Sequence, residues 1–428
     1  MSMGKTLVVV GQGYVGLPMA LEAASAGLRV HGLDVNQGVV DALNAGTSHI
    51  GDISDAVLQS SLQNGYSATT DPSVIRDADY VIVCVPTPLD VSGGPDLRPV
   101  EASGRTIGQH ITPGTTVILE STTYPGTTEE VFAPLVLASG LTLGTDVHIA
   151  FSPERIDPGR TDFGVKNTPK VVGGLTDACT EAARELYAMF IDTVVPAGGA
   201  KEAEMAKLLE NTFRHVNIAL VNEMVRFSKD LDIDLWNAID LAETKPFGFM
   251  PFRPGPGVGG HCIPVDPSYL SHRVKAKLGY AFRMVELAEE INHAAPEYVA
   301  DRIQANLNRQ GKAVQGASVL LLGVTYKPNI ADRRESPADP LASRLARWGA
   351  EISYADPYVP NWTPDGLDGA EFTAVEDAAE AAAKADIVVH LQPHAEFDLE
   401  ALARASKAFL DTRGRLAGRE DIEGLDVL

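Results

Sequence analysis

A chain of 428 residues exceeds what one hydrophobic core usually organises, and it indicates two or three domains. Hydrophobic residues make up 45% of the chain and charged residues 21%, which places it far from both disordered and membrane-embedded proteins. Lys and Arg total 35 against 57 for Asp and Glu, and the resulting net charge of −22 repels polyanions, so nucleic acid is a poor partner.

The opening part of the chain alternates strand-like and helix-like segments. The predicted buried strands cover residues 7–10, 28–33, 80–85, 116–119 and 147–151, and a helix is predicted over 18–26. Strands that alternate with helices of this length are typical of parallel sheets covered on both faces. We therefore expect a doubly wound Rossmann domain over residues 1–199.

A central helical region is expected over residues 200–312. Residues 202–231 contain few glycines or prolines and predict a long spine helix, and a second helical stretch is predicted over 281–310. Between them, residues 245–267 are rich in Gly and Pro and predict a loop. A loop of this length is usually either functional or disordered.

The last part of the chain, residues 313–428, repeats the pattern of the first. Strands are predicted over 319–324 and 351–354 with a helix over 337–348 between them, and the segment 385–390 resembles 78–83. A second Rossmann-like domain follows, although without a glycine fingerprint it need not bind a dinucleotide. The fold class is thus α/β, with two doubly wound parallel-sheet domains joined by a long helical spine.

A glycine fingerprint directly follows the first strand and precedes the first helix. Gly11 permits a tight turn, Gly13 lets a pyrophosphate approach the backbone, and Gly16 lets helix and strand pack closely. Asp34 stands 18 residues after Gly16, at the end of the next strand, where a carboxylate binds the adenine ribose and disfavours the extra phosphate of NADP. NAD is the expected cofactor; the alternative is a tight turn with an ordinary surface aspartate.

Cysteine use suggests both a location and a nucleophile. Cys84, Cys179 and Cys262 cannot all pair within the chain and show no metal-ligand spacing, so we expect a reducing, cytoplasmic location and no metal site. We also expect no membrane span, because no run of residues is long and apolar enough. Cys262 follows a glycine turn and precedes Asp266 by four residues. If a helix opens there, its dipole favours the thiolate. The alternative is a small buried hydrophobe, which is the interpretation of the other two cysteines.

Lys207 and Asn211 lie four residues apart in the predicted spine helix, and therefore on one face. Taken alone, such a pair is usually a solvated face. Further segments of defined pattern occur along the chain: 85–88, 120–128, 151–155, 259–267, 323–328 and 411–413. Together with the fingerprint and the spine helix, their order and spacing resemble the family of UDP-glucose and GDP-mannose dehydrogenases over essentially the whole chain.

This resemblance implies a four-electron oxidation of a nucleotide sugar with two NAD molecules used in turn. Cys262 would add to the aldehyde formed first, and the thioester formed next would be hydrolysed by water. Lys207 and Asn211 would stabilise the reacting oxygen, and Asp266 would position or deprotonate water with Thr122 and Glu154.

The resemblance also implies binding residues and a dimer. Those expected to contact NAD, besides the three glycines and Asp34, are Tyr14, Val15, Pro86, Thr87, Thr122 and Arg334. Those expected to contact the UDP-sugar are Glu154, Arg155, Lys207, Asn211, Arg214, Arg253, Gly259, Lys327 and Arg413. Arg253 matches a residue that in relatives reaches the neighbouring subunit's sugar site, so a homodimer is implied. Prolines in the segment 85–88 would equally serve as simple strand stops.

Three segments bear on the sugar. Residues 46–50 resemble members that act on N-acetylhexosamine nucleotides rather than on UDP-glucose, and residues 211–219 and 245–249 resemble UDP-N-acetylglucosamine dehydrogenases. Arg214 departs from the UDP-glucose type. UDP-GlcNAc is therefore the predicted substrate, with UDP-ManNAc or UDP-glucose as alternatives. A simple hydroxyacid dehydrogenase leaves the Cys262 segment without a purpose, and a non-catalytic NAD-binding sensor would bind without turnover although every matched chemical position is intact.

Overall fold

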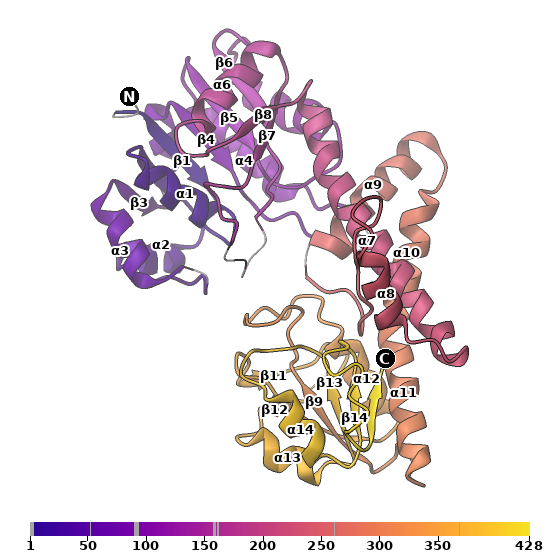
Figure 1. Cartoon of the computed structure of the whole chain (residues 1–428). Helices are drawn as coiled ribbons and strands as arrows, with labels where there is room; N and C mark the ends of the chain where they lie inside the picture. The colour runs from indigo at the N-terminus through magenta and orange to yellow at the C-terminus, as the bar shows by residue number, and fades with distance from the viewer. Residues whose placement is uncertain are drawn as a thin grey trace. The chain divides into compact units, whose positions relative to one another are not determined.

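The computed structural model describes residues 4–51, 53–89, 94–156, 160, 162–260, 262–367 and 369–428, with only the backbone described at Cys262. The chain divides into two compact units, Met1–Glu210 with Ser268–Tyr280 and Asn211–Pro267 with Ala281–Leu428. Each unit contains one large sheet with helices around it (Figure 1). The domain limits expected from the sequence, after residues 199 and 312, stay a prediction.

The first unit is built on an eight-stranded sheet of order β3-β2-β1-β4-β5-β6-β7-β8. Its strands are β1 Thr6–Val10, β2 Arg29–Leu33, β3 Tyr66–Thr69, β4 Tyr80–Val83, β5 Thr115–Leu119, β6 Val147–Phe151, β7 Lys170–Gly174 and β8 Val194–Pro196. Its helical segments are α1 Gly16–Ser25, α2 Gln37–Asn44, α3 Asp55–Gln63, the 3-10 segment η1 Pro72–Asp77, α4 Arg98–His110, the π segment η2 Thr128–Phe132, α5 Ala133–Leu137 and α6 Asp177–Tyr187.

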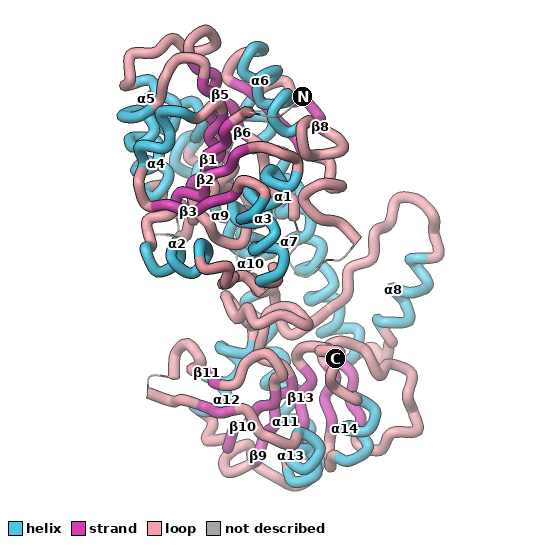
Figure 2. The backbone as a smooth tube through the Cα atoms, turned by 90° about the vertical axis from the view of Figure 1, so that its left-hand side faces the viewer, coloured by secondary structure: helices cyan, strands magenta, loops and turns pink. Residues whose placement is uncertain are grey.

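Helices cover both faces of this sheet, as a doubly wound fold requires. Successive side chains of a strand point to opposite faces. Leu7 and Val9 of β1 therefore join the core that includes α1 and α6, while Val8 joins the core that includes α4 and α5. Figure 2 shows α4 and α5 on one side of the sheet and α1 and α3 on the other.

Strand pairing in this sheet is parallel from β3 through β6, as the apolar runs predict. The β6–β7 pair is antiparallel, which differs from the all-parallel expectation, and β3, β7 and β8 were not predicted. Sheets of this class commonly carry an antiparallel edge. The chain order reverses between β1 and β4, so the carboxyl ends of these strands form the switch point where such folds bind ligands.

Five helices follow the first sheet: α7 Ala200–Asp230, α8 Leu235–Glu243, α9 Cys262–Leu278, α10 Arg283–His293 and α11 Ala295–Arg309. The predicted spine helix is confirmed as α7, with 31 residues. The predicted helix over 281–310 is instead two helices, because the ring of Pro296 is tolerated in the first turn of α11 but not inside a longer helix. Helix α9 begins at Cys262, inside the expected loop.

The second large sheet has five parallel strands in the order β10-β9-β13-β14-β15. The strands are β9 Ser318–Leu322, β10 Glu351–Ala355, β13 Ile387–His390, β14 Phe409–Asp411 and β15 Leu425–Val427. Around them lie α12 Ala338–Arg347, α13 Ala378–Lys384, α14 Leu399–Ala405 and the small antiparallel pair β11 Asn361–Trp362 and β12 Phe372–Thr373. The predicted fold class, with two Rossmann-like sheets, is thereby confirmed.

None of the helices in the described part of the chain combines the length and the apolarity needed to cross a membrane.

Candidate active site

The glycine turn after β1 has the geometry that its sequence predicts. Gly11 has φ of +88°, and a Cβ there would lie 2.5 Å from the carbonyl oxygen of Cys84. A Cβ at Gly16 would lie 1.9 Å from the carbonyl oxygen of Gly11, so the start of α1 tolerates no side chain. A Cβ at Gly13, in contrast, would meet nothing within 4 Å. The backbone at Gly13 is thus open to a ligand, which fits a pyrophosphate beside the N-terminus of α1.

Asp34 lies directly beside this turn. Its Oδ2 accepts a hydrogen bond from the N–H of Gln12 at 2.9 Å, and its Oδ1 accepts one from the N–H of Asn36 at 2.9 Å. Each carboxylate oxygen has two lone pairs, so acceptor capacity remains for ribose hydroxyls. Tyr14, in the turn itself, is exposed, and Val15 forms the N-cap of α1.

Gln12 is a part of this turn that sequence reasoning missed. Its side chain is fully buried, donates from Nε2 to the carbonyl oxygen of Val9 at 2.8 Å, and accepts from the hydroxyl of Tyr66 at 2.8 Å. Burial raises the pKa of Tyr66, so this hydroxyl stays protonated and remains a donor. The Gln12 side chain therefore fixes the glycine turn from the core side. The fingerprint specifies only the glycines, so the sequence pattern does not reveal this role.

Two loops meet at the carboxyl ends of β4 and β5. Thr87 donates from Oγ1 to the carbonyl oxygen of Thr122 at 2.8 Å, and Ser121 donates to that of Val85 at 2.8 Å. Pro86 between them is exposed, whereas Thr87 is buried. These neighbouring parallel strands end at the same edge as β1 and β2. The structure therefore brings the expected cofactor residues of the first unit to one edge of one sheet.

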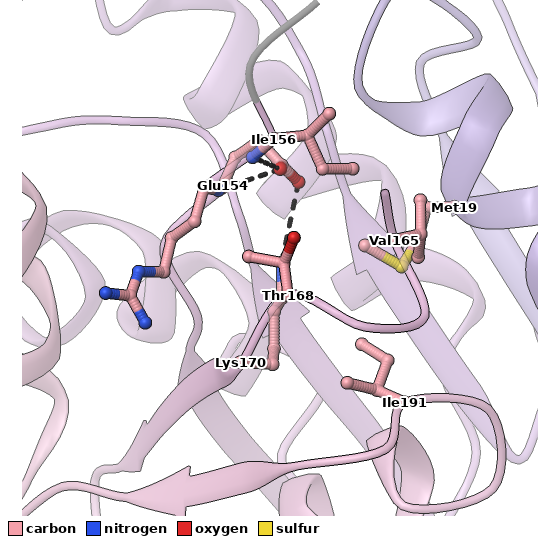
Figure 3. Close-up of a pocket in the computed structure, with 8 residues that line it drawn as sticks. Met19, Glu154, Ile156, Val165, Thr168, Lys170 and Ile191 are labelled. Atoms are coloured by element: carbon pink, nitrogen blue, oxygen red, sulfur yellow. Dashed lines mark hydrogen bonds and ion pairs between the residues drawn. The ribbon is translucent and has the colours of Figure 1, made fainter. Parts of the chain in front are cut away.

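Glu154 follows β6 at the same edge, and its carboxylate is nearly buried. Its Oε1 accepts the backbone N–H groups of Arg155 at 2.7 Å and Ile156 at 2.5 Å, and its Oε2 lies 3.5 Å from the Nζ of Lys170. A small pocket adjoins these side chains, with Val165 and Ile191 on its apolar wall (Figure 3).

Lys170 also contacts a second carboxylate, at 3.1 Å from Oε1 of Glu120. Burial raises the pKa of Glu120, while the hydroxyl of Tyr187 donates to it. Burial opposes the charge of Lys170, but the neighbouring carboxylates raise its pKa. Sequence reasoning missed Lys170; the available signal was a lysine at the start of a run of apolar and small residues, Val171–Gly174.

Arg155 points its guanidinium away from this cluster. Its Nη2 lies 2.6 Å from Oε1 of Glu210 on α7, and its Nη1 donates to the carbonyl oxygen of Pro169 at 2.8 Å. Its expected part in sugar binding stays a prediction.

Helices α7 and α9 bring together two of the expected catalytic side chains. In the second unit, Asn211 donates from Nδ2 to Oδ2 of Asp266 at 2.6 Å, and both side chains are buried. Lys207 precedes Asn211 by one turn of α7 and is also buried. Cys262 is the first residue of α9, so the helix opens where the dipole argument requires, and Asp266 follows one turn later. The side chain of Cys262 lies outside the described part of the structure.

The glycine loop before α9 packs closely on the second sheet. A Cβ at Gly259 would lie 2.6 Å from the carbonyl oxygen of Glu335, and Gly260 donates its N–H to the carbonyl oxygen of Arg334 at 2.9 Å. A Cβ at Gly255 would lie 2.9 Å from Nη1 of Arg413. The structure thereby gathers Gly259, Arg334 and Arg413 within the second unit.

The backbone of Lys327 lies close to this group, because the side chain of the preceding residue, Tyr326, packs against Gly259 and Gly260. Burial lowers the pKa of Arg413 to about 10, and its Nε donates to the carbonyl oxygen of Leu391 at 2.7 Å. The guanidinium of Arg334 lies 2.6 Å from Asp332.

Two expected substrate residues are not brought to this group. Arg214 is exposed on α7. Arg253 forms ion pairs with Asp240 at 2.8 Å and Glu243 at 3.0 Å, both on α8. Neither observation tests a role toward a second subunit.

A doubly wound sheet with an open glycine turn and an acid at its switch point is the arrangement that binds dinucleotides. Models of the UDP-glucose/GDP-mannose dehydrogenase family match the chain in three parts: its NAD-binding domain at residues 5–191, its central domain at 201–294 and its UDP-binding domain at 320–417. The chain belongs to this family of NAD-dependent nucleotide-sugar dehydrogenases.

Characterised relatives share most of their length with the chain. It is 36% identical over 424 residues to the UDP-N-acetyl-D-mannosamine dehydrogenase of Salmonella typhimurium, covering 96% of this chain and 98% of that one. It is 35% identical to the NDP-N-acetyl-D-galactosaminuronic acid dehydrogenase of Ralstonia nicotianae, covering 96% of each. The solved UDP-D-ManNAc dehydrogenase of Pyrococcus horikoshii is similar with a TM-score of 0.86 and 31% identity, covering 95% of each chain.

Proposed function

We propose that this enzyme oxidises the primary alcohol of a UDP-N-acetylhexosamine to a carboxylate in two successive steps. The observation that carries the proposal is the buried Asn211–Asp266 pair, which joins α7 to α9 one turn after the helix opens at Cys262. A dehydrogenase that stopped at an aldehyde or ketone would need neither a nucleophile nor a water-positioning acid at that place.

The Gly11–Gly16 turn and Asp34 would hold NAD, which would supply the hydride acceptor for each of the two oxidations. The thiol of Cys262 would add to the aldehyde carbon to give a thiohemiacetal, and Lys207 and Asn211 would stabilise negative charge that develops on its oxygen. Loss of the second hydride leaves a thioester. Asp266 then positions a water for attack on the thioester carbon, which releases the carboxylate and the thiol.

The second sheet supplies cations for the diphosphate. Lys327 and Arg413, expected to contact the UDP-sugar, lie on the segments that pack against the 255–260 loop. The chain carries a net charge of −22, so an anionic substrate needs a local group of this kind.

The identity of the hexosamine is a choice between two proposals. The segment 46–50 favours an N-acetylhexosamine, and the segments 211–219 and 245–249 favour UDP-GlcNAc. The names of the relatives from Salmonella typhimurium and Pyrococcus horikoshii favour UDP-ManNAc. The two sugars differ at one stereocentre, so one assay separates them.

A second copy of the chain is the proposed partner. Helix α7 and the segment after α8 leave large apolar side chains exposed in the second unit: Phe213, Leu220, Phe227, Leu231, Phe247 and Met250. Apolar surface of this extent usually marks an interface. A homodimer would cover it and bring Arg253 near the partner. The cytoplasmic location rests on the cysteine content and stays a prediction.

The test is an assay of UDP-GlcNAc, UDP-ManNAc, UDP-GalNAc and UDP-glucose, each with NAD, recording NADH formed per uronate released. About two NADH per uronate is expected, because the oxidation removes four electrons. Cys262→Ala should abolish uronate formation, whereas Cys179→Ala, on the buried face of α6, should retain it. An active Cys262→Ala enzyme would refute the thioester route.

A further inference from the structure

Lys170, the first residue of β7, is a buried cation between two carboxylates. Its side chain is 5% exposed, and its Nζ lies 3.1 Å from Oε1 of Glu120. The same Nζ lies 3.5 Å from Oε2 of Glu154, which lines the pocket shown in Figure 3. Glu120 directly follows β5, Glu154 follows β6 and Lys170 begins β7, so three neighbouring strands contribute one group each. This cluster adjoins the candidate site through Glu154.

Among the described residues, the other charged and titratable groups around the cluster are engaged elsewhere or neutral. Tyr187 on α6 donates to Glu120, and the Sγ of Cys84 lies 3.9 Å from Oε2 of Glu120. Burial raises the pKa of both Tyr187 and Cys84, which therefore stay uncharged. The guanidinium of Arg155 pairs with Glu210. Lys170 is thus the cation that meets the Glu154 carboxylate.

Stability alone does not account for this arrangement. A buried ion pair costs desolvation that its attraction only partly returns, and an apolar side chain of similar size often serves a core as well. Here one ammonium faces two carboxylates, which leaves the cluster with an excess of negative charge when both are ionised. An arrangement that is expensive as a core element is typical of a functional site.

We propose that Lys170 is a positioning residue that holds and orients the Glu154 carboxylate for the reaction. Glu120, to which Tyr187 donates, is the second carboxylate that fixes the ammonium of Lys170. This inference rests on the proposed function of Glu154 in the water and proton-transfer network. The two backbone N–H groups hold Oε1 of Glu154, and Lys170 fixes Oε2. Removal of the Lys170 ammonium frees Oε2 of Glu154 and leaves the buried carboxylates without a cation.

The experiment compares four variants with the wild-type enzyme: Lys170→Met, Lys170→Arg, the double variant Lys170→Met/Glu120→Gln, and Lys166→Met as an exposed control in the same segment. Lys170→Met should lower kcat about tenfold or more with the KM for NAD unchanged, since general acid–base networks contribute at least that much. Lys170→Arg keeps the charge and should recover most of kcat. Lys166→Met should match the wild type.

The double variant separates positioning from folding. It removes the unpaired buried carboxylate that Lys170→Met leaves behind, so its thermal midpoint should return toward that of the wild type. Under the proposal its kcat stays low, because Glu154 still lacks its cation.

A double variant that regains both stability and kcat would make Lys170 a merely structural residue and overturn the inference, as would wild-type kcat in Lys170→Met. A wild-type enzyme that forms no NADH with any nucleotide sugar would instead overturn the proposed function, and this inference with it.

Discussion

Strands β1 and β9 hold the same place in the two large sheets. Each lies between the strand that follows it and a later one, β2 and β4 in the first sheet and β10 and β13 in the second. The glycine after each strand has positive φ, +88° at Gly11 and +81° at Gly323. Gly11 donates its N–H to the carbonyl oxygen of Leu33 at 2.8 Å, and Gly323 donates to that of Ala355 at 2.9 Å.

The acid at the end of the next strand repeats as well. Oδ2 of Asp34 accepts the N–H of Gln12 at 2.9 Å, and Oδ2 of Asp356 accepts the N–H of Val324 at 2.7 Å. The Oδ1 atom of each carboxylate accepts the N–H group two residues further on, at 2.9 and 2.8 Å. The acid therefore stabilises the turn in both sheets, whether or not a dinucleotide binds there.

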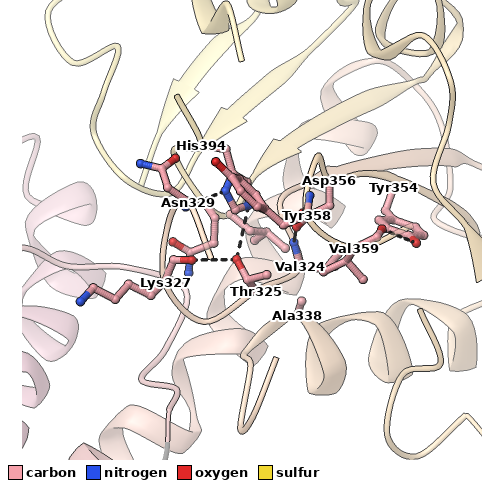
Figure 4. Close-up of polar contacts among 12 residues, drawn as sticks. Val324, Thr325, Lys327, Asn329, Ala338, Tyr354, Asp356, Tyr358, Val359 and His394 are labelled. Carbon is pink, nitrogen blue, oxygen red and sulfur yellow. Dashed lines mark hydrogen bonds and ion pairs between the residues drawn. The ribbon is translucent and has the colours of Figure 1, made fainter. Parts of the chain in front are cut away.

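The two turns differ in the residues after the glycine. Gly13 leaves open space over the first turn, whereas Thr325 and His394 close the second (Figure 4). His394 accepts the N–H of Asn329 on Nδ1, so its Nε2 carries the proton and lies 3.2 Å from Oδ2 of Asp356. Asp356 is 7% exposed. The open space at Gly13 therefore distinguishes the turn that suits NAD, because the acid is present in both turns.

Among the variants that test this comparison of the two turns, Gly13→Val should have the largest effect, and the effect is on NAD binding. A Cβ at Gly13 meets nothing within 4 Å and its φ is ordinary, so the variant should fold normally. Its side chain would occupy the space left for the pyrophosphate, and the Kd for NAD should rise about a hundredfold, near 3 kcal/mol. Titration calorimetry measures the Kd.

The matched control is Gly198→Ala, at a glycine with equally open surroundings outside the turn. It should bind NAD as the wild type does. Unchanged affinity in Gly13→Val would show that the open space is not where the cofactor lies.

The second prediction concerns pH and the helix that follows β9. The first turn of α12 contains Asp339, whose Oδ1 accepts the indole N–H of Trp362 at 2.8 Å, and burial raises its pKa to about 6. The raised pKa means that the folded state favours the protonated form. This contribution is complete below the ordinary pKa near 4 and is lost as the pH rises through about 6.

Asp339→Asn keeps the acceptor for Trp362 and removes the titration. The variant should therefore exceed the wild type in stability at pH 8 by at most about 3 kcal/mol, and the difference should vanish near pH 4. Urea unfolding at both pH values measures it. A wild-type advantage at pH 8 would refute the assignment.

The third prediction separates the two acids by Asp34→Asn and Asp356→Asn. The buried Asp356 accepts from two backbone N–H groups and His394, and an amide NH₂ would face one of these donors. Its replacement should cost about 1 to 3 kcal/mol of stability with NAD affinity intact. Asp34→Asn should show the reverse, weaker NAD binding with a smaller loss of stability. Thermal unfolding and NAD titration on both variants decide, and equal effects at the two sites would break the comparison.

Much of the fold followed from the sequence, because its signals are local. Parallel strands buried on both faces read as continuous apolar runs, and β6 was predicted with its observed limits. Strand β7 was missed because it begins with Lys170 and ends in two glycines. Helix α9 was not predicted, because Pro264 and Pro267 indicate a loop. Pro264 fits the first turn of this helix, but Pro267 lies inside it, which a sequence pattern does not anticipate.

The site residues likewise differ in how far the sequence predicts them. The turn glycines and Asp34 have fixed spacing along the chain, so the sequence predicts their arrangement. Lys170 and Tyr187 meet Glu120 only through the packing of β5, β7 and α6, and no pattern along the chain records such a contact. Asn211 and Asp266 lie 55 residues apart, and only the resemblance to a family pointed to both.

The smallest effect on stability is expected from a second acid in each sheet. Asp79 directly precedes β4, which lies beside β1, and Asp386 directly precedes β13, which lies beside β9. Asp79 accepts the N–H of Thr6 at 2.8 Å and pairs with Lys5, while Asp386 accepts the N–H of Ser318 at 3.2 Å and pairs with Lys312 and Lys407. The lysines are about half exposed, and solvent screens pairs of this kind to below about 1 kcal/mol. Lys5→Met should therefore change the thermal midpoint by a few degrees at most.

The double variant Lys312→Met/Lys407→Met should lose somewhat more, because the two pairs hold the pKa of Asp386 at about 2. Its deficit should shrink in 1 M salt, which screens exposed charges. A loss that is unaffected by salt would mean that the lysine stems stabilise the sheet by packing, and that the two strand starts resemble each other in backbone geometry alone.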